Sequence, residues 1–311
     1  MTDSTTNSNP RPILRSRLYV PGTKVSWIAK AVASGADAII LDFDDAVGAD
    51  EKDAARADVA EAIRDGGVPI PLFVRINDLS TTWALDDLEA IVQPGLFGVV
   101  VPRVTEVSQL VALDFLLSWL ELRAGMPNGT VVLSPIYETA ASVHFAYEFA
   151  ASSPRVDYVG GIATDGGDIQ REVSYRWSPS AWETVAMRAN ALVAVRAAGV
   201  AHPLTGIWTS LDDEEGLKAF AKQGRDLGYE GMDVIHPSHV SAVHEAFGFD
   251  DHSIEQAQRI VELAVQGSSD GAAVHDGDER AVGAFRFEGR MIDAAMVRTA
   301  TELLRRAGKI N

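Results

Sequence analysis

The chain has 311 residues, of which 47% are hydrophobic and 23% charged, and this composition is typical of a globular protein with a large core. It contains no cysteine, which excludes disulfides, a thiolate zinc site and a cysteine nucleophile. The formal net charge of −17 disfavours nucleic acid and anionic membranes as partners. Any anionic ligand would therefore need a local cationic pocket or a bound metal.

The first twelve residues, MTDSTTNSNPRP, are polar, and we expect residues 1–12 to form a disordered tail. They fit neither a signal peptide nor a transit peptide. The longest apolar runs have the length of strands and are too short to span a bilayer. A cytoplasmic location without membrane contact is therefore expected.

Short runs rich in Val, Ile and Leu alternate with longer amphipathic segments, which predicts parallel strands joined by helices. We expect strands at residues 17–20, 38–43, 71–76, 98–104, 131–137, 156–162, 204–208 and 232–235. We expect helices at residues 24–34, 51–65, 83–92, 106–123, 139–150, 181–198, 213–227 and 238–246. Eight such units favour a closed (β/α)8 TIM barrel over residues 13–250. The alternative, an open doubly wound sheet, lacks its usual Gly-x-Gly-x-x-Gly turn.

The pattern changes after residue 247, and we expect residues 251–311 to form a C-terminal extension. Two helices are predicted there, at residues 253–267 and 291–307. The segment between them is rich in Gly, Asp and small residues. The extension is either a lid or an arm that reaches a neighbouring subunit.

Ionisable and polar residues gather where the predicted strands end. They are Asp42, Asp44, Asp45, Arg75, Asn77, Pro102, Arg103, Glu138, Asp165, Asp168 and His236. The active site of a (β/α)8 barrel lies at the carboxyl ends of its strands. The distribution therefore predicts a reactive rim on an otherwise apolar barrel.

Two carboxylates from adjacent strands predict a magnesium site, because Mg²⁺ prefers oxygen ligands and keeps part of its hydration shell. Glu138 is the first expected ligand, and the second is Asp165 or Asp168, which spacing alone does not separate. Glu138 has a structural alternative as the cap of the helix near Thr139, and Asp168 has the same alternative. Zinc is disfavoured, because the seven histidines show no HExxH or similar spacing.

Arg75 follows Phe73 by two positions in VRIN, so both side chains point into the barrel if one does. A buried arginine needs an anion. It would either pair with Asp42 or Asp44, or bind a substrate carboxylate or a developing enolate.

Lys52 and Arg56 lie four residues apart and share one face of a predicted helix. They form either a solvated surface stripe or a contact for phosphates. His236 is either a reactive group or a strand-end histidine that is hydrogen-bonded to the backbone.

Six segments in order, RSRLYVPG, SGADAIILDFDDAV, VRIN, IYETA, GLKAFAKQGRDLGYEGMDVIHPSHV and EGRMIDAAMV, cover nearly the whole chain. Together they resemble the citrate lyase β-subunit-like (CitE-like) family of the HpcH/HpaI aldolase superfamily, which includes relatives of malyl-CoA and citramalyl-CoA lyases. The resemblance implies a homotrimeric or hexameric TIM barrel that uses Mg²⁺ and coenzyme A thioesters. Its chemistry would make or break a carbon–carbon bond by a Claisen or retro-Claisen route.

The resemblance also implies roles for individual residues. Glu138 and Asp168 would hold the metal, and Arg75 would polarise the reacting carbonyl. Asp293 in RMID would be the acid/base carboxylate that a neighbouring subunit contributes. Coenzyme A phosphates and substrate would be met by a further set, which is Lys24, Lys52, Arg56 and Pro237.

The sequence departs from the family pattern in three places. Phe43-Asp44-Asp45 replaces leucine-glutamate-aspartate, so that Asp44 is one methylene shorter than the glutamate that, in the family, helps to order the groups around the metal. GGIATDGGDI replaces the commoner segment before the metal aspartate, and Ser238-His239 stand where glutamine is usual. Asp44 and Asp45 are nevertheless expected in the catalytic site, with the substrate choice open.

Three functions follow for testing. The first is a coenzyme A-dependent lyase that acts on a β-hydroxyacyl thioester of a small dicarboxylic acid. The second is a metal-dependent aldolase on free 2-keto acids, or an acyl-CoA thioesterase. The third is a non-catalytic barrel that works inside a larger complex.

Overall fold

The computed structural model describes residues 11–267 and 284–310. The chain divides into two compact units, unit 1 (Met1–Phe247) and unit 2 (Gly248–Asn311), and the boundary expected at residue 250 lies close to this division. The expected tail lies outside the described residues up to residue 10. Most of the glycine-rich segment of the extension lies outside them as well.

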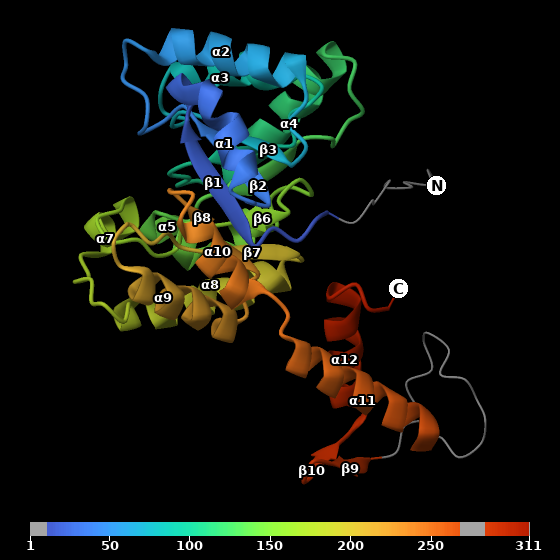
Figure 1. The fold of residues 1–311 in the computed structure, drawn as a ribbon. Coiled ribbons are helices and arrows are strands. Elements are labelled where there is room, and N and C mark those ends of the chain that lie inside the picture. Colours follow the sequence, from blue (N-terminus) through green and yellow to red (C-terminus); the bar gives the residue numbers. More distant parts are fainter. Residues whose placement is uncertain (1–10, 268–283, 311) are drawn as a thin grey trace. The chain divides into compact units, whose positions relative to one another are not determined.

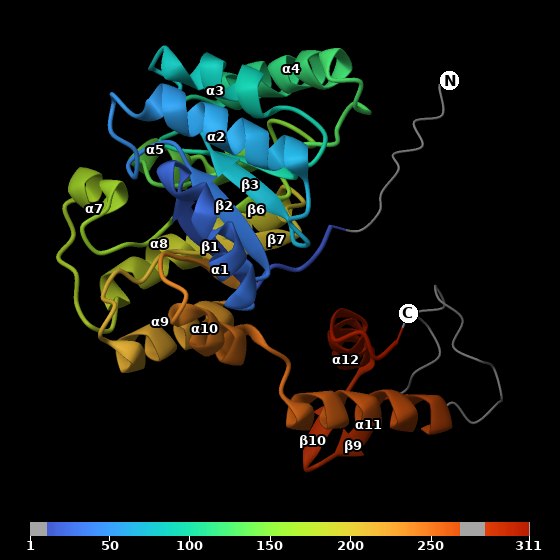
Figure 2. The same ribbon diagram turned by 45° about the horizontal axis from the view of Figure 1, so that its top comes forward.

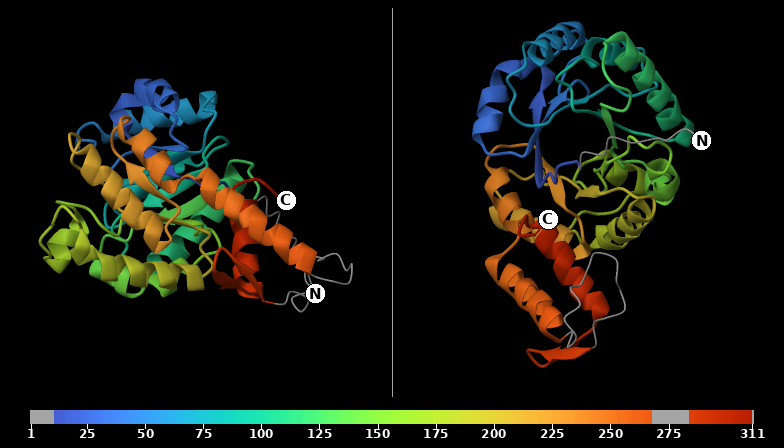
Figure 3. Two further views of the ribbon diagram at one scale, coloured as in Figure 1. Left: turned by 60° about the horizontal axis from the view of Figure 1, so that its bottom comes forward. Right: turned by 90° about the vertical axis from the view of Figure 1, so that its right-hand side faces the viewer.

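Unit 1 contains an eight-stranded parallel sheet in the order β5-β4-β3-β2-β1-β8-β7-β6. Bridges from Leu133 to Val156 and from Ile136 to Gly160 join the β5 and β6 segments and close the sheet. The strands surround a central axis with the helices outside (Figure 3, right). The prediction of a (β/α)8 TIM barrel is therefore confirmed, and the doubly wound alternative is wrong. The strands are β1 (Ser16–Pro21), β2 (Ala38–Asp42), β3 (Leu72–Arg75), β4 (Gly98–Val101), β5 (Val132–Pro135), β6 (Tyr158–Val159), β7 (His202–Thr205) and β8 (Gly231–Val234).

Helices follow the strands of unit 1 in sequence, and α2, α3 and α4 lie side by side on one flank (Figure 2). Their bounds are η1 (Gly22–Trp27), α1 (Ile28–Ala33), α2 (Lys52–Asp65), α3 (Trp83–Ile91), α4 (Val107–Arg123), α5 (Ala140–His144), α6 (Ala146–Ala150), α7 (Asp168–Val173), η2 (Trp182–Thr184), α8 (Val185–Ala197), α9 (Glu214–Leu227) and α10 (His239–Phe247). The helix expected at 139–150 is broken at Phe145, whose φ of −104° and ψ of 36° are not helical. The short α7 was not expected, because six residues after a glycine turn carry no apolar period.

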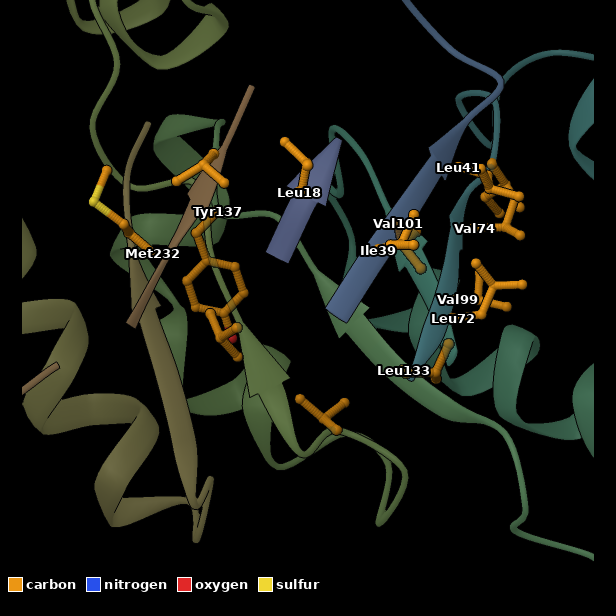
Figure 4. Packing of buried hydrophobic residues seen from close by; sticks show 14 of the residues in the cluster. Leu18, Ile39, Leu41, Leu72, Val74, Val99, Val101, Leu133, Tyr137 and Met232 are labelled. Carbon is orange, nitrogen blue, oxygen red and sulfur yellow. The ribbon is translucent and has the colours of Figure 1, made fainter. Parts of the chain in front are cut away.

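Alternate residues along each strand face opposite sides of the barrel wall. The outer set, which includes Leu18, Ile39, Leu41, Val74 and Val99, packs in the main core beneath the helices (Figure 4). The inner set fills the barrel with Ala38, Ile40, Phe73, Val100, Val132, Tyr158 and Leu204. The same alternation places charged residues inside near the strand ends.

Gly98 makes room for the inner side chains of Phe73 and Val132. A Cβ atom at this position would lie 2.6 Å from the Phe73 ring and 2.5 Å from Val132, closer than packed atoms approach. Phe73 then meets Phe97 and Tyr158 edge to face, with ring centroids 5.0 and 5.6 Å apart. The lower barrel is thus filled by these rings and by the buried ion pair of Arg17 and Asp233, whose guanidinium lies over the Phe73 ring.

Unit 2 consists of two packed helices and a hairpin (Figure 1). Its elements are α11 (Asp251–Gly267), β9 (Phe285–Phe287), β10 (Arg290–Ile292) and α12 (Ala294–Arg306). Its buried core is small, formed by Ala257, Ala300 and Leu304. The helix expected from residue 291 begins three residues later, because the preceding residues pair as β10. In the described residues of both units, no helix combines the length and the hydrophobicity that crossing a bilayer requires.

Candidate active site

Arg75 and Asp42 lie on neighbouring strands at the carboxyl rim. They are register partners in the pairing of β2 with β3, and Arg75 Nε and Nη2 each donate to Asp42 at 2.7 Å. Burial opposes the charge of Arg75, but the hydrogen bonds and the charge of Asp42 raise its pKa. The prediction that Arg75 points inward with Phe73 is confirmed. We expected Arg75 either to pair with Asp42 or Asp44 or to bind a substrate anion, and the structure shows the pairing with Asp42.

The third nitrogen of Arg75 faces two further acids. Nη1 lies 3.2 Å from Asp45 and 3.8 Å from Asp44. Asp45 is exposed, whereas Asp44 is buried, and burial raises the pKa of Asp44. The structure therefore brings Arg75, Asp44 and Asp45 together as expected.

Arg103 is the residue of this rim to which we assigned no role from the sequence. Its Nε donates to Asp78 and its Nη2 donates to Asp44, both at 2.7 Å, while its backbone N–H donates to Glu138 at 2.8 Å. Its backbone φ is +46°, a left-handed conformation that side chains with a Cβ disfavour. The sequence shows a basic residue at a strand end among acidic strand ends, which indicates a place at the rim. It does not indicate the left-handed backbone conformation of Arg103.

Glu138 follows β5 and does not cap a helix. The cap of α5 is Thr139, whose hydroxyl accepts from the Ser142 N–H, so the structural alternative for Glu138 is wrong. Burial raises the pKa of Glu138 to about 7, although Arg75 and the Arg103 N–H oppose the shift. The negative charge of Asp168 raises it further, so the two carboxylates interact.

Asp168 is the first residue of α7, and its side chain does not cap that helix. Its carboxylate lies 2.7 Å from Arg171 and 3.6 Å from Arg103. Asp165 is exposed, and no described hydrogen bond or ion pair joins it to Arg103, Glu138 or Asp168. The geometry therefore groups Asp168, rather than Asp165, with Glu138.

The donor set suits magnesium. Glu138 and Asp168 offer carboxylate oxygens whose mutual repulsion a divalent cation would relieve. No group of three or more His, Asp or Glu side chains arranged for a metal occurs within residues 11–267 and 284–310. A cation at this rim would therefore take the rest of its ligands from water and substrate oxygens, as Mg²⁺ commonly does.

Lys52 is buried, so its interpretation as part of a solvated surface stripe is wrong. The expected contact of Lys52 and Arg56 with phosphates stays a prediction. The Lys52 ammonium is buried and donates to the backbone oxygens of Phe43 and Asp44 and to Asn77 Oδ1. Arg56 pairs with two acids on α2 and α3, which are Asp53 and Asp87. Lys52 thus ties α2 to the rim through three neutral oxygens, whereas the charge of Arg56 is balanced by two carboxylates.

Lys24, Pro237 and Asp293 occupy three different settings. Lys24 is exposed on η1, just after β1. Pro237 lies half-buried between β8 and α10. The exposed His236 beside it accepts the Ser238 backbone N–H at Nδ1, so the alternative of a strand-end histidine hydrogen-bonded to the backbone is confirmed. Asp293 belongs to unit 2, where its carboxylate caps α12 by accepting the Met296 N–H at 3.0 Å.

Comparison with known proteins identifies the family. Residues 15–237 match the HpcH/HpaI aldolase/citrate lyase family. This chain belongs to that family. A citrate lyase subunit beta-like protein of Deinococcus radiodurans is 34% identical over 95% of this chain and 98% of its own length. A (3S)-malyl-CoA thioesterase of Cereibacter sphaeroides is 32% identical over 95% of both. The predicted resemblance, and with it the prediction of an enzyme of a lyase family, is confirmed.

Solved structures agree. The CitE protein of Mycobacterium tuberculosis, crystallised with magnesium, acetoacetate and coenzyme A, is 26% identical with a TM-score of 0.69, over 96% of this chain and 100% of that one. A citrate lyase of Burkholderia xenovorans, 20% identical over 96% of this chain and 92% of its own, has a TM-score of 0.80 and supports the fold.

Proposed function

We propose that this protein is a magnesium-dependent carbon–carbon lyase that cleaves or forms a β-hydroxyacyl-CoA thioester of a small dicarboxylic acid, of the malyl-, citramalyl- or citryl-CoA kind. The observation that carries the proposal is the pair of interacting carboxylates, Glu138 and Asp168, beside the cation of Arg75 at the barrel rim. Membership of an aldolase and citrate lyase family supports it. So does the magnesium and coenzyme A complex of the M. tuberculosis relative.

In this proposal Glu138 and Asp168 hold the magnesium ion. When bound, the ion supplies a Lewis acid for the carbonyl of the keto acid. The protein's own residues supply the rest. Arg75 is kept charged and fixed by Asp42, so its Nη1, which faces the exposed Asp45, is preorganised to stabilise negative charge on a thioester enolate oxygen.

Asp293 is the proposed acid/base group, which would exchange a proton with the carbon α to the thioester. Its carboxylate is exposed and holds one backbone N–H, so that one face is accessible. We propose, as the resemblance implies, that it serves the barrel of a neighbouring subunit in a homotrimer or hexamer. Asp44 and Asp45 act by holding Arg103 and Arg75 at the rim.

Coenzyme A phosphates would be met by Lys24, which is exposed on η1 at the carboxyl side of β1. Lys52 and Arg56 are given no part in this contact, because the Lys52 ammonium is buried against three neutral oxygens and Arg56 is paired with Asp53 and Asp87. The expected cytoplasmic location stays a prediction.

A thioesterase is the second candidate, favoured by the 32% identity with the (3S)-malyl-CoA thioesterase of Cereibacter sphaeroides. Both functions would need the same rim. They differ in whether the carbon–carbon bond or the thioester bond is broken.

The test incubates the purified protein and Mg²⁺ separately with malyl-CoA, citramalyl-CoA and citryl-CoA. A lyase releases acetyl-CoA and a 2-keto acid in equal amounts, whereas a thioesterase releases free coenzyme A and the hydroxy acid. Release of free coenzyme A without a 2-keto acid would contradict the lyase function and support the thioesterase function. Turnover of free 2-keto acid aldols, with no thioester consumed, would sink both.

A further inference from the structure

The side chain of Arg103 lies among the carboxylates of the proposed metal site. The acids around the guanidinium are Asp44, Asp45, Asp78 and Asp168, and Glu138 accepts the Arg103 backbone N–H. Nε and Nη2 are bound at 2.7 Å, to Asp78 and Asp44. Nη1 is left at longer range, 3.7 Å from Asp45 and 3.6 Å from Asp168. One guanidinium thus connects the proposed metal ligand Asp168 with acids that are not proposed as ligands.

The backbone of Arg103 serves the same arrangement. Its φ of +46° is unfavourable for any residue but glycine, and such outliers persist where the surroundings fix them. In this conformation the N–H donates to Glu138 Oε1 at 2.8 Å. The same residue therefore orients one proposed ligand through its backbone and faces the other through its side chain.

The number of carboxylates matters for chemistry at a magnesium ion. Mg²⁺ is octahedral, and a catalytic ion must keep positions for water and substrate oxygens. Two carboxylate ligands leave most of that shell open, and each further acid that joined them would take a position from water or substrate. Asp44 is poised to join, because its Oδ2 is buried and has no hydrogen-bond partner among the described residues, with Arg75 Nη1 3.8 Å away.

We propose that Arg103 is a positioning residue that limits the metal site to Glu138 and Asp168 and weakens its affinity for the metal. It does so by binding Asp44 and Asp78 and by competing with the metal for Asp168. The weaker affinity leaves open coordination positions for substrate. The inference rests on the proposed metal site.

The test uses Mn²⁺ as the probe, in the full-length protein without substrate. Electron paramagnetic resonance gives the dissociation constant, and water-proton relaxation gives the number of waters on the bound ion. In Arg103→Gln we expect the dissociation constant to fall at least about fivefold, the low end of couplings between competing ligands. We also expect fewer bound waters, because freed carboxylates replace them.

Two further variants make the result specific. Arg171 also pairs with Asp168, at 2.7 Å, but its side chain is 77% exposed. Arg171→Gln should therefore change the affinity by less than about twofold, since exposed ion pairs are weak. Arg103→Lys covers the case in which Arg103→Gln does not fold. A single ammonium cannot hold Asp44 and Asp78 in the guanidinium's fork geometry, so we expect a smaller tightening in the same direction.

Unchanged or weaker Mn²⁺ binding in the Arg103 variants, with the wild-type number of waters, would overturn the inference and leave the metal site standing. An effect of Arg171→Gln equal to that of Arg103→Gln would also overturn it. A wild-type protein that binds no Mn²⁺, or whose binding survives Glu138→Gln, overturns the proposed site itself and the inference with it.

Discussion

The guanidinium of Arg75 holds the carboxylate of Asp42, its register partner across β2 and β3, through two hydrogen bonds of 2.7 Å. Both side chains are nearly inaccessible, 11% and 4% exposed. The pair is therefore a buried ion pair, in which removal of one partner leaves an uncompensated charge.

Asp42→Asn should lower the free energy of unfolding by about 3 kcal/mol, the lower end for a broken buried pair. Urea denaturation measures this. The control is Asp45→Asn, which removes an acid 3.2 Å from the same arginine but 67% exposed. It should cost about 1 kcal/mol or less. Equal losses in the two variants would show that Arg75 does not depend on Asp42.

Asp168 and Asp165 are the two candidates for the second metal ligand, and each serves as the control for the other. Asp168 begins α7, and Asp165 lies in the turn before it. Asp168→Asn should abolish most magnesium-dependent turnover, whereas Asp165→Asn should leave it within about twofold, because exposed surface groups rarely matter. The measurement is the rate against Mg²⁺ concentration for each variant. Loss of turnover in Asp165→Asn with retention in Asp168→Asn would reverse the assignment.

Substitution of Lys24 should affect substrate binding, whereas substitution of Lys52 should affect the stability of the fold. Lys24→Ala should raise the KM for the thioester about fivefold without changing kcat, because it removes an exposed phosphate contact made equally in ground and transition states. Lys52→Met should lower the melting temperature, since its ammonium bonds Phe43, Asp44 and Asn77. If Lys52→Met raises KM in a protein of unchanged stability, the buried assignment is contradicted.

One helix face of unit 1 is apolar and exposed. Val111, Phe115, Trp119 and Leu122 follow each other at helical spacing on α4, and Phe115 and Leu122 are 78% and 75% exposed. Such a stripe favours contact with a second copy in the proposed homo-oligomer. Phe115→Glu with Leu122→Glu should reduce the mass measured by light scattering. A wild-type monomer, or an unchanged oligomer in the double variant, would count against this face.

The sequence was sufficient for the barrel because short apolar runs for the strands alternate with longer amphipathic segments for most of the helices. It also placed Arg75 correctly, since a period of two that starts at Phe73 settles which way the arginine points. Helix bounds failed where tertiary contacts decide them, as at Phe145 and at the pairing of β10.

The site was less accessible to sequence reasoning. Lys52 and Arg56 share a helical face, but the pattern could not tell that Asn77 and Asp87 on neighbouring segments face them. Arg103 was recognised at a strand end, yet its central position depends on a left-handed backbone that most sequences would avoid. Pairing across distant segments, and not residue type, decides these roles.

The last prediction concerns acid stability at the amino end of the barrel. His244 Nε2 lies 2.8 Å from Ser16 Oγ and 3.5 Å from Asp37, and Arg15 binds the same aspartate. Burial lowers the pKa of His244, helped by Arg15 and opposed by Asp37. The pKa of Asp37 is also lowered; burial opposes that shift, and its hydrogen bonds to Arg15 and the charge of His244 outweigh it.

In the unfolded chain His244 takes up a proton near pH 6.5, whereas in the folded chain its lowered pKa delays protonation to a lower pH. The neutral His244 therefore stabilises the fold above pH 6.5, and this stabilisation is lost as the pH falls below 6.5. The contribution of Asp37 has the same sign but is lost only below about pH 4, beneath the ordinary aspartate pKa. The midpoint of urea denaturation should therefore decrease more between pH 7.5 and pH 5.5 in the wild type than in His244→Gln. Equal falls in the two proteins would show that His244 is protonated alike in the folded and unfolded chains.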